Sequence, residues 1–290
     1  MYPFSLIFKG ENMNTKNEVI AILEQNRGVP ISGTQIAKSL NISRNAVWKT
    51  INLLKNEGYS IDAVSNRGYT LALDNDILSL AGIIPYLADE TVAKKTHIHK
   101  SLKSTNKTAK ELAIAGAEHG TVIIADTQTA GKGRYDKHFF SPPKGGLYTS
   151  IILRASDFDL TNTTHITKTA AVAVCKSVEN LAKVEPKIKP VNDIFLNGKK
   201  ICGILTEAIS DLESGNIEWA VVGIGINVSI TDFPSELENI ATSIFAENPQ
   251  NIDAPFRSRL AAELINFFLT DKKTEIDIES EYEKRILSTC

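Results

Sequence analysis

Apolar residues recur with the spacing of amphipathic helices in the first part of the chain. They predict three short helices, at residues 17–25, 32–40 and 43–57. Residues 61–73 then read as two short strands around a turn, which is the pattern of a β-hairpin. Three helices followed by a hairpin wing are typical of a winged helix-turn-helix domain, which we place at residues 14–73.

Local signals at the helix ends support this domain. Ser32 is followed three residues later by Gln35, which is the spacing of a capping box, and Ser43 is the expected N-cap of the third helix. Asn41 stands between these helices and tolerates the left-handed conformation that a sharp turn needs. Helical patterning begins only after Met13, which is therefore an alternative start to Met1.

The third predicted helix has a polar face on the side away from its apolar stripe. This face carries Arg44, Asn45 and Lys49, and Arg67 lies at the tip of the predicted wing. Such side chains hydrogen-bond phosphates and base edges, so we take these four residues as a candidate DNA-binding surface. We expect Trp48, on the same helix, to be partly buried. The alternative is that the helices form only a packing or dimerisation module with a solvated surface.

A different pattern begins after a connector at residues 74–95. Strand-like apolar runs now alternate with longer helical segments, so residues 96–290 are predicted to form an α+β domain built on a mixed sheet. Asn197-Gly198 lies between two strand-like runs and is the strongest short-range signal for a hairpin. The other strands are expected at residues 121–125, 147–153 and 219–228, and the helices at 104–117, 166–181, 255–269 and 275–286.

Composition narrows the class of protein. The 290 residues are 42% hydrophobic and 23% charged, and no apolar run approaches the ~20 residues that span a bilayer. The three cysteines are widely spaced without a CxxC pair, so we expect a cytoplasmic protein with no bound metal. Residues 14–73 carry seven Lys/Arg against four Asp/Glu, whereas residues 232–290 carry six against twelve. A mildly basic first domain permits a surface that faces phosphates.

The most informative short motif is Gly131-Lys132-Gly133-Arg134, inside the glycine-rich and basic segment 129–144. Two glycines let the backbone approach a ligand closely, and two cations can meet carboxylate or phosphate oxygens. It is not a phosphate-binding P-loop, because no Gly-Lys-Ser/Thr follows and no helix is predicted there. The segment is expected to be a mobile loop. Taken alone, a flexible basic surface loop is the better interpretation of this motif.

Two further clusters carry polar or small residues at strand ends. Asn192 and Asp193 are followed across the predicted hairpin by Lys199 and Lys200, which together would make a compact polar group. A turn whose lysines are merely solvated is the alternative. The strand at residues 223–227 has two glycines and would let a ligand or a neighbouring backbone pack close.

Taken in order, these motifs resemble those of the bifunctional biotin–protein ligases that double as biotin operon repressors. The resemblance runs from about residue 17 to 286 and covers both predicted domains. The segments that carry it are residues 43–49, 67–69, 104–106, 128–134, 140–142, 192–193, 200–207 and 223–227. It implies a winged helix-turn-helix joined to a mixed-sheet catalytic domain of the biotin/lipoate-ligase type.

The resemblance also assigns roles within the site. The ureido end of biotin is implied to meet the polar segment before the first catalytic helix and the glutamine before the glycine loop. The loop folds over the ligand, and a lysine reaches its carboxylate and the phosphate. Adenine is implied to lie against Phe139, near Asn192 and Asn227. The resemblance therefore implies the following biotin-binding residues: Ser104, Thr105, Asn106, Gln128, Lys132, Gly133, Arg134 and Lys200.

The implied reaction is an adenylation followed by a transfer. The carboxylate of biotin attacks the α-phosphate of ATP, bound with Mg²⁺, to give biotinyl-5′-AMP, and a carrier lysine then attacks the acyl carbon. Lys132, Arg134 and Lys200 are the candidates for stabilising the charge that develops. The implied partners are the biotin carboxyl carrier domain of acetyl-CoA carboxylase or related carboxylases, the operator DNA of biotin synthesis or transport genes, and a second copy of the chain when the adenylate is bound.

The sequence departs from the family pattern in several places. Lys132 stands where many relatives have arginine, Phe139 where tryptophan is frequent, and Pro190-Val191 where Trp-Pro is usual. The usual C-terminal SH3-like domain is expected to be missing, which would shorten the catalytic domain. A biotin-sensing repressor with weak or no ligase activity is therefore one alternative. A lipoate ligase is another, although the chain has no Arg-Arg-x-x-Gly-Gly-Gly segment.

Overall fold

The computed structural model describes the chain in six stretches and divides it into two compact units. The units are Met1–Pro85 with Asp253–Ser258, and Tyr86–Ile252 with Arg259–Cys290. The predicted connector at 74–95 is thus shared between them, and the domain limits at 73 and 96 stay predictions. The described residues are 15–64, 67–155, 163–210, 217–246, 255–270 and 276–287.

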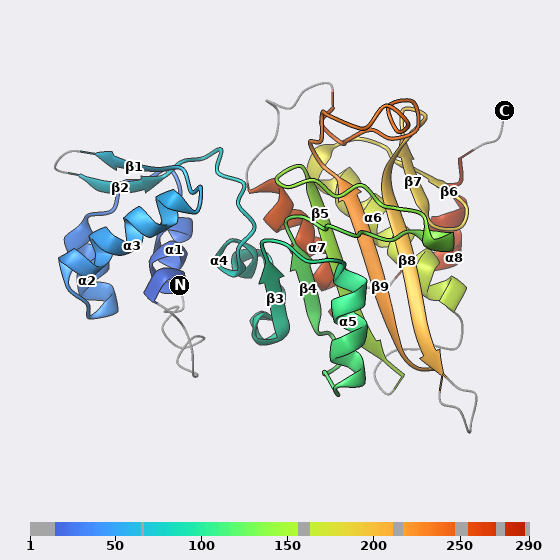
Figure 1. Cartoon of the computed structure of the whole chain (residues 1–290), viewed down its shortest axis with the longest axis horizontal. Coiled ribbons are helices and arrows are strands. Elements are labelled where there is room, and N and C mark those ends of the chain that lie inside the picture. Colours follow the sequence, from blue (N-terminus) through green and yellow to red (C-terminus); the bar gives the residue numbers. More distant parts are fainter. Residues whose placement is uncertain are drawn as a thin grey trace. The chain divides into compact units, whose positions relative to one another are not determined.

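The first unit is a small helical domain with a two-stranded wing (Figure 1). Its helices enclose a core to which Leu23, Ile36, Val47 and Leu54 contribute, all essentially inaccessible to solvent. These residues belong to the apolar stripes read from the sequence, so the three predicted helices are confirmed. The elements are α1 (Thr15–Gln25), α2 (Gly33–Leu40), α3 (Arg44–Asn56), β1 (Ile61–Val64), β2 (Gly68–Leu71) and α4 (Leu80–Ile83).

The turn between α2 and α3 forms as its sequence predicts. Ser32 and Gln35 make a reciprocal capping box at the start of α2, and the Ser43 hydroxyl accepts from the backbone of Ala46, 3.1 Å away. Asn41 has φ 53° and ψ 43°, the left-handed conformation expected of it. The tight helix-to-helix turn is therefore set by local side chains.

The wing is tied to the helices by backbone contacts. Ile31 and Tyr69 exchange two hydrogen bonds, each of 2.9 Å. Gly68 has φ +111°, and a Cβ there would lie 2.1 Å from the carbonyl oxygen of Ile31, so this close approach requires glycine. Ser65 and Asn66 of the predicted turn lie outside the described residues.

The second unit contains a seven-stranded mixed sheet with the order β3-β4-β5-β9-β8-β7-β6. The β3–β4 pair is parallel, and the other neighbouring strands are antiparallel. The strands are β3 (Thr96–His99), β4 (Val122–Ala125), β5 (Gly146–Arg154), β6 (Lys187–Lys189), β7 (Asp193–Leu196), β8 (Lys199–Ser210) and β9 (Ile217–Asn227). The helices are α5 (Thr105–Ile114), α6 (Thr163–Ala182), α7 (Phe256–Leu269) and α8 (Ile278–Glu283), with short 3₁₀ turns at Ile84–Tyr86, Glu90–Lys95 and Arg134–Asp136.

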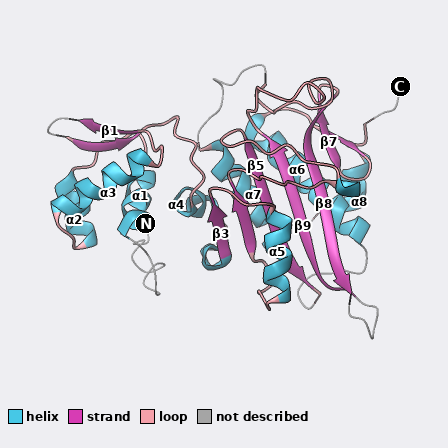
Figure 2. Ribbon diagram, viewed as in Figure 1, coloured by secondary structure: helices cyan, strands magenta, loops and turns pink. Residues whose placement is uncertain are grey.

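Helices cover both faces of this sheet (Figure 2). α5 packs on one face through Ala109 and Ala113, against Ile152, Trp219 and Val221. α6 packs on the other face, with a stripe of buried residues. The predicted α+β class is confirmed. In the described stretches, no helix has the length and apolar character that would let it cross a membrane.

Candidate functional site

The candidate site is an open cavity of about 450 Å³ on the face of the sheet that α5 partly covers. Three glycines lie on this face where other side chains would fill the space. Gly203 and Gly225 are register partners on β8 and β9, and Gly223 lies two residues away on the same face of β9. Because these positions carry no side chain, the sheet is hollowed where α5 begins.

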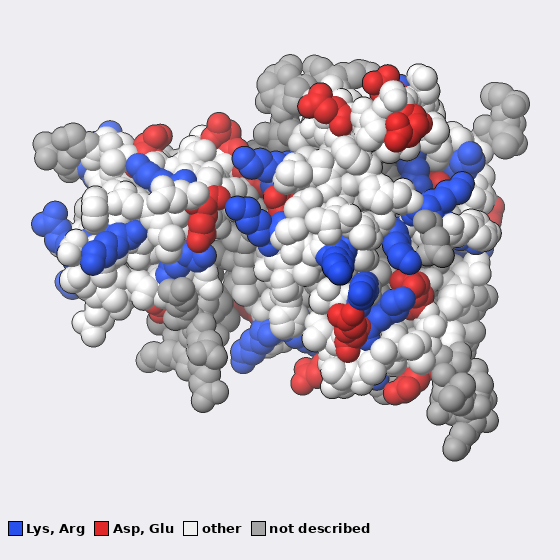
Figure 3. All heavy atoms as spheres, in the orientation of Figure 1, with Lys and Arg blue, Asp and Glu red and all other residues white. Residues whose placement is uncertain are grey.

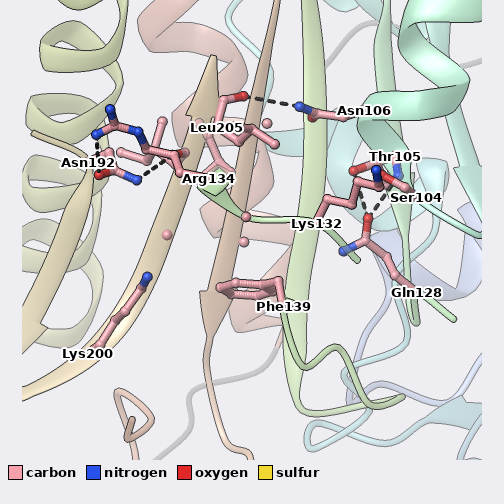
Figure 4. Close-up of a pocket in the computed structure, with 16 residues that line it drawn as sticks. Ser104, Thr105, Asn106, Gln128, Lys132, Arg134, Phe139, Asn192, Lys200 and Leu205 are labelled. Atoms are coloured by element: carbon pink, nitrogen blue, oxygen red, sulfur yellow. Dashed lines mark hydrogen bonds between the residues drawn. The ribbon is translucent and has the colours of Figure 1, made fainter. Parts of the chain in front are cut away.

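One end of the cavity is built mainly from neutral polar groups at the N-terminus of α5, and Lys132 lies beside them (Figure 4). The Gln128 side chain accepts from the backbone N–H of Thr105 at 2.8 Å and donates to the Ser141 hydroxyl at 3.0 Å. Ser104 is the N-cap of α5, and Asn106 is held by partners on the two strands β5 and β8. Ser104, Thr105 and Asn106 are all buried. This end can therefore recognise a neutral ligand through directed hydrogen bonds.

The glycine-rich segment folds into a compact turn across the cavity. Gly133 donates to the carbonyl of Lys137 at 2.7 Å, and Phe139 donates to that of Gly131 at 2.9 Å. The Phe139 ring points into the cavity, and a Cβ on Gly225 would lie 2.6 Å from it. Phe139 gives this glycine-rich and basic segment an apolar anchor in the cavity. The mobility of the segment stays a prediction.

The other end of the cavity is cationic. Lys200 Nζ lies 2.7 Å from the carboxylate of Asp193, and both side chains are about three-quarters buried. Arg134 reaches the side-chain oxygen of Asn192 at 3.4 Å, and Asn192 in turn donates to the carbonyl of Ile204 at 2.9 Å. This end can meet a carboxylate or phosphate oxygen with two positive charges.

The structure brings most of the predicted site residues together, from segments as far apart in sequence as 104 and 200. Asn227 is the exception, because it does not line this cavity in the described part of the chain. It is 5% exposed, and its side-chain amide donates to the carbonyl of Thr242 at 3.1 Å. The predicted residues that line the cavity are Ser104, Thr105, Asn106, Gln128, Lys132, Gly133, Arg134, Phe139, Asn192 and Lys200.

Sequence reasoning missed two serines that organise the polar end. Ser141 binds Gln128, and Ser150, in the middle of β5, contacts both Thr105 and Asn106. The signal for Ser150 was a small hydroxyl pair, Thr149 and Ser150, inside a strand whose remaining residues are mostly apolar, since a fully buried polar side chain requires partners.

The two cysteines in the described stretches, Cys175 and Cys202, supply no nucleophile to this cavity. Cys202 follows Lys200 closely, yet it is completely buried, and burial raises the pKa of its thiol well above the ordinary value. Burial also raises the pKa of Cys175 to about 12. Both residues remain protonated thiols near neutral pH, and neither is a candidate nucleophile.

The candidate DNA-binding surface lies on α3 of the first unit. Arg44, Asn45 and Lys49 are exposed, as is Arg67 beside the wing, and α3 contains no acidic residue. Lysine and arginine side chains are prominent on this unit in Figure 3. Trp48 is 54% exposed, so the expectation that it is partly buried is wrong. Its position on α3 turns the ring away from the stripe formed by Val47 and Ile51.

Comparisons with known proteins agree with this division of the chain. Residues 15–70 match an HTH domain, and residues 98–227 match the Biotin/lipoate A/B protein ligase family. Among solved structures, the chain is similar to the biotin protein ligase from Aquifex aeolicus in complex with biotin and ATP, with 26% identity and a TM-score of 0.54. That match covers 66% of this chain and 78% of the other. Fold and site together define a ligase of the biotin/lipoate type joined to a helix-turn-helix domain.

Two relatives that match most of this chain are named as bifunctional proteins. The bifunctional ligase/repressor BirA of Bacillus subtilis is 41% identical over 240 residues, which are 82% of this chain and 73% of that protein. The protein of the same name in Escherichia coli is 28% identical over 81% of this chain and 70% of that protein. The chain belongs to the family of bifunctional ligase/repressors.

Proposed function

We propose that this chain joins biotin to ATP, giving biotinyl-5′-AMP and pyrophosphate, and passes the biotinyl group to a lysine of a carrier domain. The carrier is that of acetyl-CoA carboxylase or a related carboxylase. The first unit binds operator DNA of biotin synthesis or transport genes, so the chain also acts as a biotin-responsive repressor. Family membership supports both roles, the match to an HTH domain supports DNA binding, and the Aquifex relative with biotin and ATP supports the ligase role.

The observation that carries the proposal is the order of chemistry along the cavity. A neutral hydrogen-bonding end, an apolar middle with Phe139, and a cationic end follow one another. Biotin presents a ureido ring, an apolar body and a carboxylate in the same order. Its ureido ring therefore meets Ser104, Asn106 and Gln128, and its carboxylate lies near Lys200 and Arg134.

The main contribution of the protein to the reaction is to place the biotin carboxylate next to the α-phosphate of ATP. Carboxylate and triphosphate are both anionic, so Lys200 and Arg134 bring them together and stabilise the charge that grows on the α-phosphate during attack. Mg²⁺ enters with ATP as part of the substrate. In the second step the carrier lysine attacks the acyl carbon and AMP leaves, with no nucleophile from the protein.

The polar end favours biotin over lipoate. Lipoate carries a dithiolane ring, which has neither an N–H nor a carbonyl. It would leave the groups around Gln128 and Asn106 without partners, and a site built on hydrogen bonds rejects such ligands strongly. Adenylation by the purified chain tests this directly. We expect biotin-dependent release of AMP with transfer of the biotinyl group to a carrier domain, and no AMP release with lipoate. Lipoate-dependent AMP formation would identify a lipoate ligase, and biotin-dependent DNA binding without AMP would identify a sensing repressor.

Arg134→Gly is expected to loosen the retention of the adenylate. The guanidinium lies at the cationic end, and its loss removes a charge-assisted contact to the phosphate of the mixed anhydride. Escaped adenylate should biotinylate bystander lysines, which an avidin blot of added serum albumin detects. If the variant forms no adenylate at all, Arg134 is needed for the chemistry and does not act in retention.

The adenylate acts as a corepressor by favouring a dimer. One small winged helix offers few phosphate contacts, and two on a symmetric operator double them, so dimerisation raises affinity. Arg44, Asn45 and Lys49 reach the major groove, and Arg67 reaches the neighbouring backbone or the minor groove. The test is the affinity of the chain for a biotin-synthesis promoter, measured with and without biotin plus MgATP. Equal affinities in the two conditions would show that the adenylate is not a corepressor.

Arg44→Ala is expected to weaken specific DNA binding by about 1–3 kcal/mol if Arg44 contacts a base edge. Lys16→Ala is the matched control, because it removes one positive charge from the same unit. Lys16 lies on α1, away from the predicted DNA-binding residues, and its ammonium group pairs with the Glu57 carboxylate at 2.8 Å. Binding can be followed by tryptophan fluorescence, since the chain has two tryptophans and Trp219 is buried in the second unit. Equal losses in the two variants would mean that Arg44 contributes only general charge.

A further inference from the structure

We propose that Glu207 is a positioning residue that decides which end of the Asn106 side chain faces the ligand. Glu207 lies on β8 and is not among the cavity-lining residues in the described stretches. The inference rests on the proposed function, because it concerns how the ureido ring of biotin is recognised. It adds a residue to which the sequence analysis gave no role.

Both hydrogens of the Asn106 side-chain amide are used in hydrogen bonds. Its side-chain N–H groups donate to the carbonyl of Leu205 at 3.1 Å and to the carboxylate of Glu207 at 2.9 Å. Its oxygen accepts from the Ser150 hydroxyl at 2.7 Å. The side chain is 6% exposed, so each of these contacts is made in a largely dry environment.

These contacts place an acceptor over the cavity. The side-chain oxygen of Asn106 lies above Gly223, where a Cβ would come within 2.0 Å of it, and Gly223 lines the cavity. Both Nδ2 hydrogens are already donated to Leu205 and Glu207, so the amide offers the ligand an oxygen with a remaining lone pair. A ureido N–H is the complementary group, and the second amide hydrogen of Gln128 suits the ureido carbonyl.

The charge of Glu207 adds to the carbonyl of Leu205 in selecting this orientation. A flipped Asn106 would turn its oxygen towards the carbonyl of Leu205 and a carboxylate, which are both acceptors. Ser150 does not prevent the flip, because a hydroxyl donates or accepts as required. Lys110 holds the carboxylate in place, with its Nζ 2.7 Å from the other oxygen of Glu207. The Lys110–Glu207 pair is about two-thirds buried, which limits solvent screening.

The variant that tests this is Glu207→Leu, which removes the acceptor. We expect the KM for biotin to rise roughly tenfold, the usual scale for one lost hydrogen-bonding constraint. The KM for MgATP and kcat should stay within about twofold, because the cationic end is unaffected. Glu207→Gln should recover part of the biotin KM, since its oxygen can still accept from Asn106. Loss of folding alone would lower the active fraction and leave both KM values unchanged.

Glu111→Gln is the control, because Glu111 lies on α5 together with Asn106 and Lys110, and its carboxylate pairs on the surface with Lys107, 3.9 Å away. In an Asn106→Ala background, Glu207→Leu should have no further effect on the biotin KM. An unchanged biotin KM in the single variant, or additive effects in the double variant, would overturn the inference. If the unaltered chain shows no biotin-dependent AMP formation, the proposed function itself fails, and this result is distinct from the other two.

Discussion

Replacing Lys200 by methionine is expected to slow formation of biotinyl-5′-AMP by about 10²–10³-fold, the usual cost of removing one group that stabilises transition-state charge. The ammonium group lies at the cationic end of the cavity, 2.7 Å from Asp193. Its loss removes a positive charge and leaves the Asp193 carboxylate to repel the incoming anions. The rate is measured as biotin-dependent exchange of labelled pyrophosphate into ATP.

The neighbouring lysine supplies the control for this experiment. Lys199 precedes Lys200 on β8, and its Nζ donates to the carbonyl of Glu238 at 2.7 Å. Adjacent residues of a strand point to opposite faces, so Lys199→Met removes the same charge from the same strand while sparing the cavity. We expect its exchange rate to stay within about twofold of the unaltered chain. Similar losses in both variants would show that overall charge is what matters.

Gly225→Ala is expected to close the apolar middle of the cavity. A Cβ at this position would lie 2.6 and 2.8 Å from two ring carbons of Phe139, so the ring must move into the space that biotin would occupy. Overpacking of this kind costs about 1–3 kcal/mol, which corresponds to a loss of roughly 5- to 150-fold in biotin affinity. Calorimetric titration with biotin measures it.

A second substitution separates this cause from damage to the sheet. Phe139→Leu in the Gly225→Ala background shortens the side chain that meets the new methyl group, and part of the biotin affinity should return. Trp219, buried between α5 and the sheet, reports whether the fold is kept. If Gly225→Ala binds biotin as tightly as the unaltered chain, Phe139 does not define the cavity wall.

The winged helix-turn-helix could be predicted from the sequence because its signals are local. Capping by Ser32 and Ser43 and the left-handed Asn41 involve partners within a few residues, and the structure contains each of them. Trp48 was the error in this unit. Its exposure depends on where the buried stripe of α3 is centred, and that is set by contacts with the other helices of the core.

The site could be predicted in part from motifs that occur in order along the chain. That order does not show where along a strand the cavity ends. Asn227 lies two residues beyond the cavity-lining Gly225 on β9, yet it is buried and donates to the carbonyl of Thr242. Phe139 appears in the sequence only as an aromatic residue after a glycine loop, and its place over Gly203 and Gly225 depends on the folded turn.

By itself, the sequence determined the helical unit, the α+β class, the family resemblance and most of the residues that line the cavity. Periodicity, caps and short motifs act over a few residues and need no knowledge of distant partners. The tertiary structure decided how these residues meet. The register that pairs Gly203 with Gly225 and Gly223 with Leu205 joins strands distant in sequence. The same pairing places Glu207 beside Asn106, 101 residues away, because side chains from distant segments become neighbours only after the sheet forms.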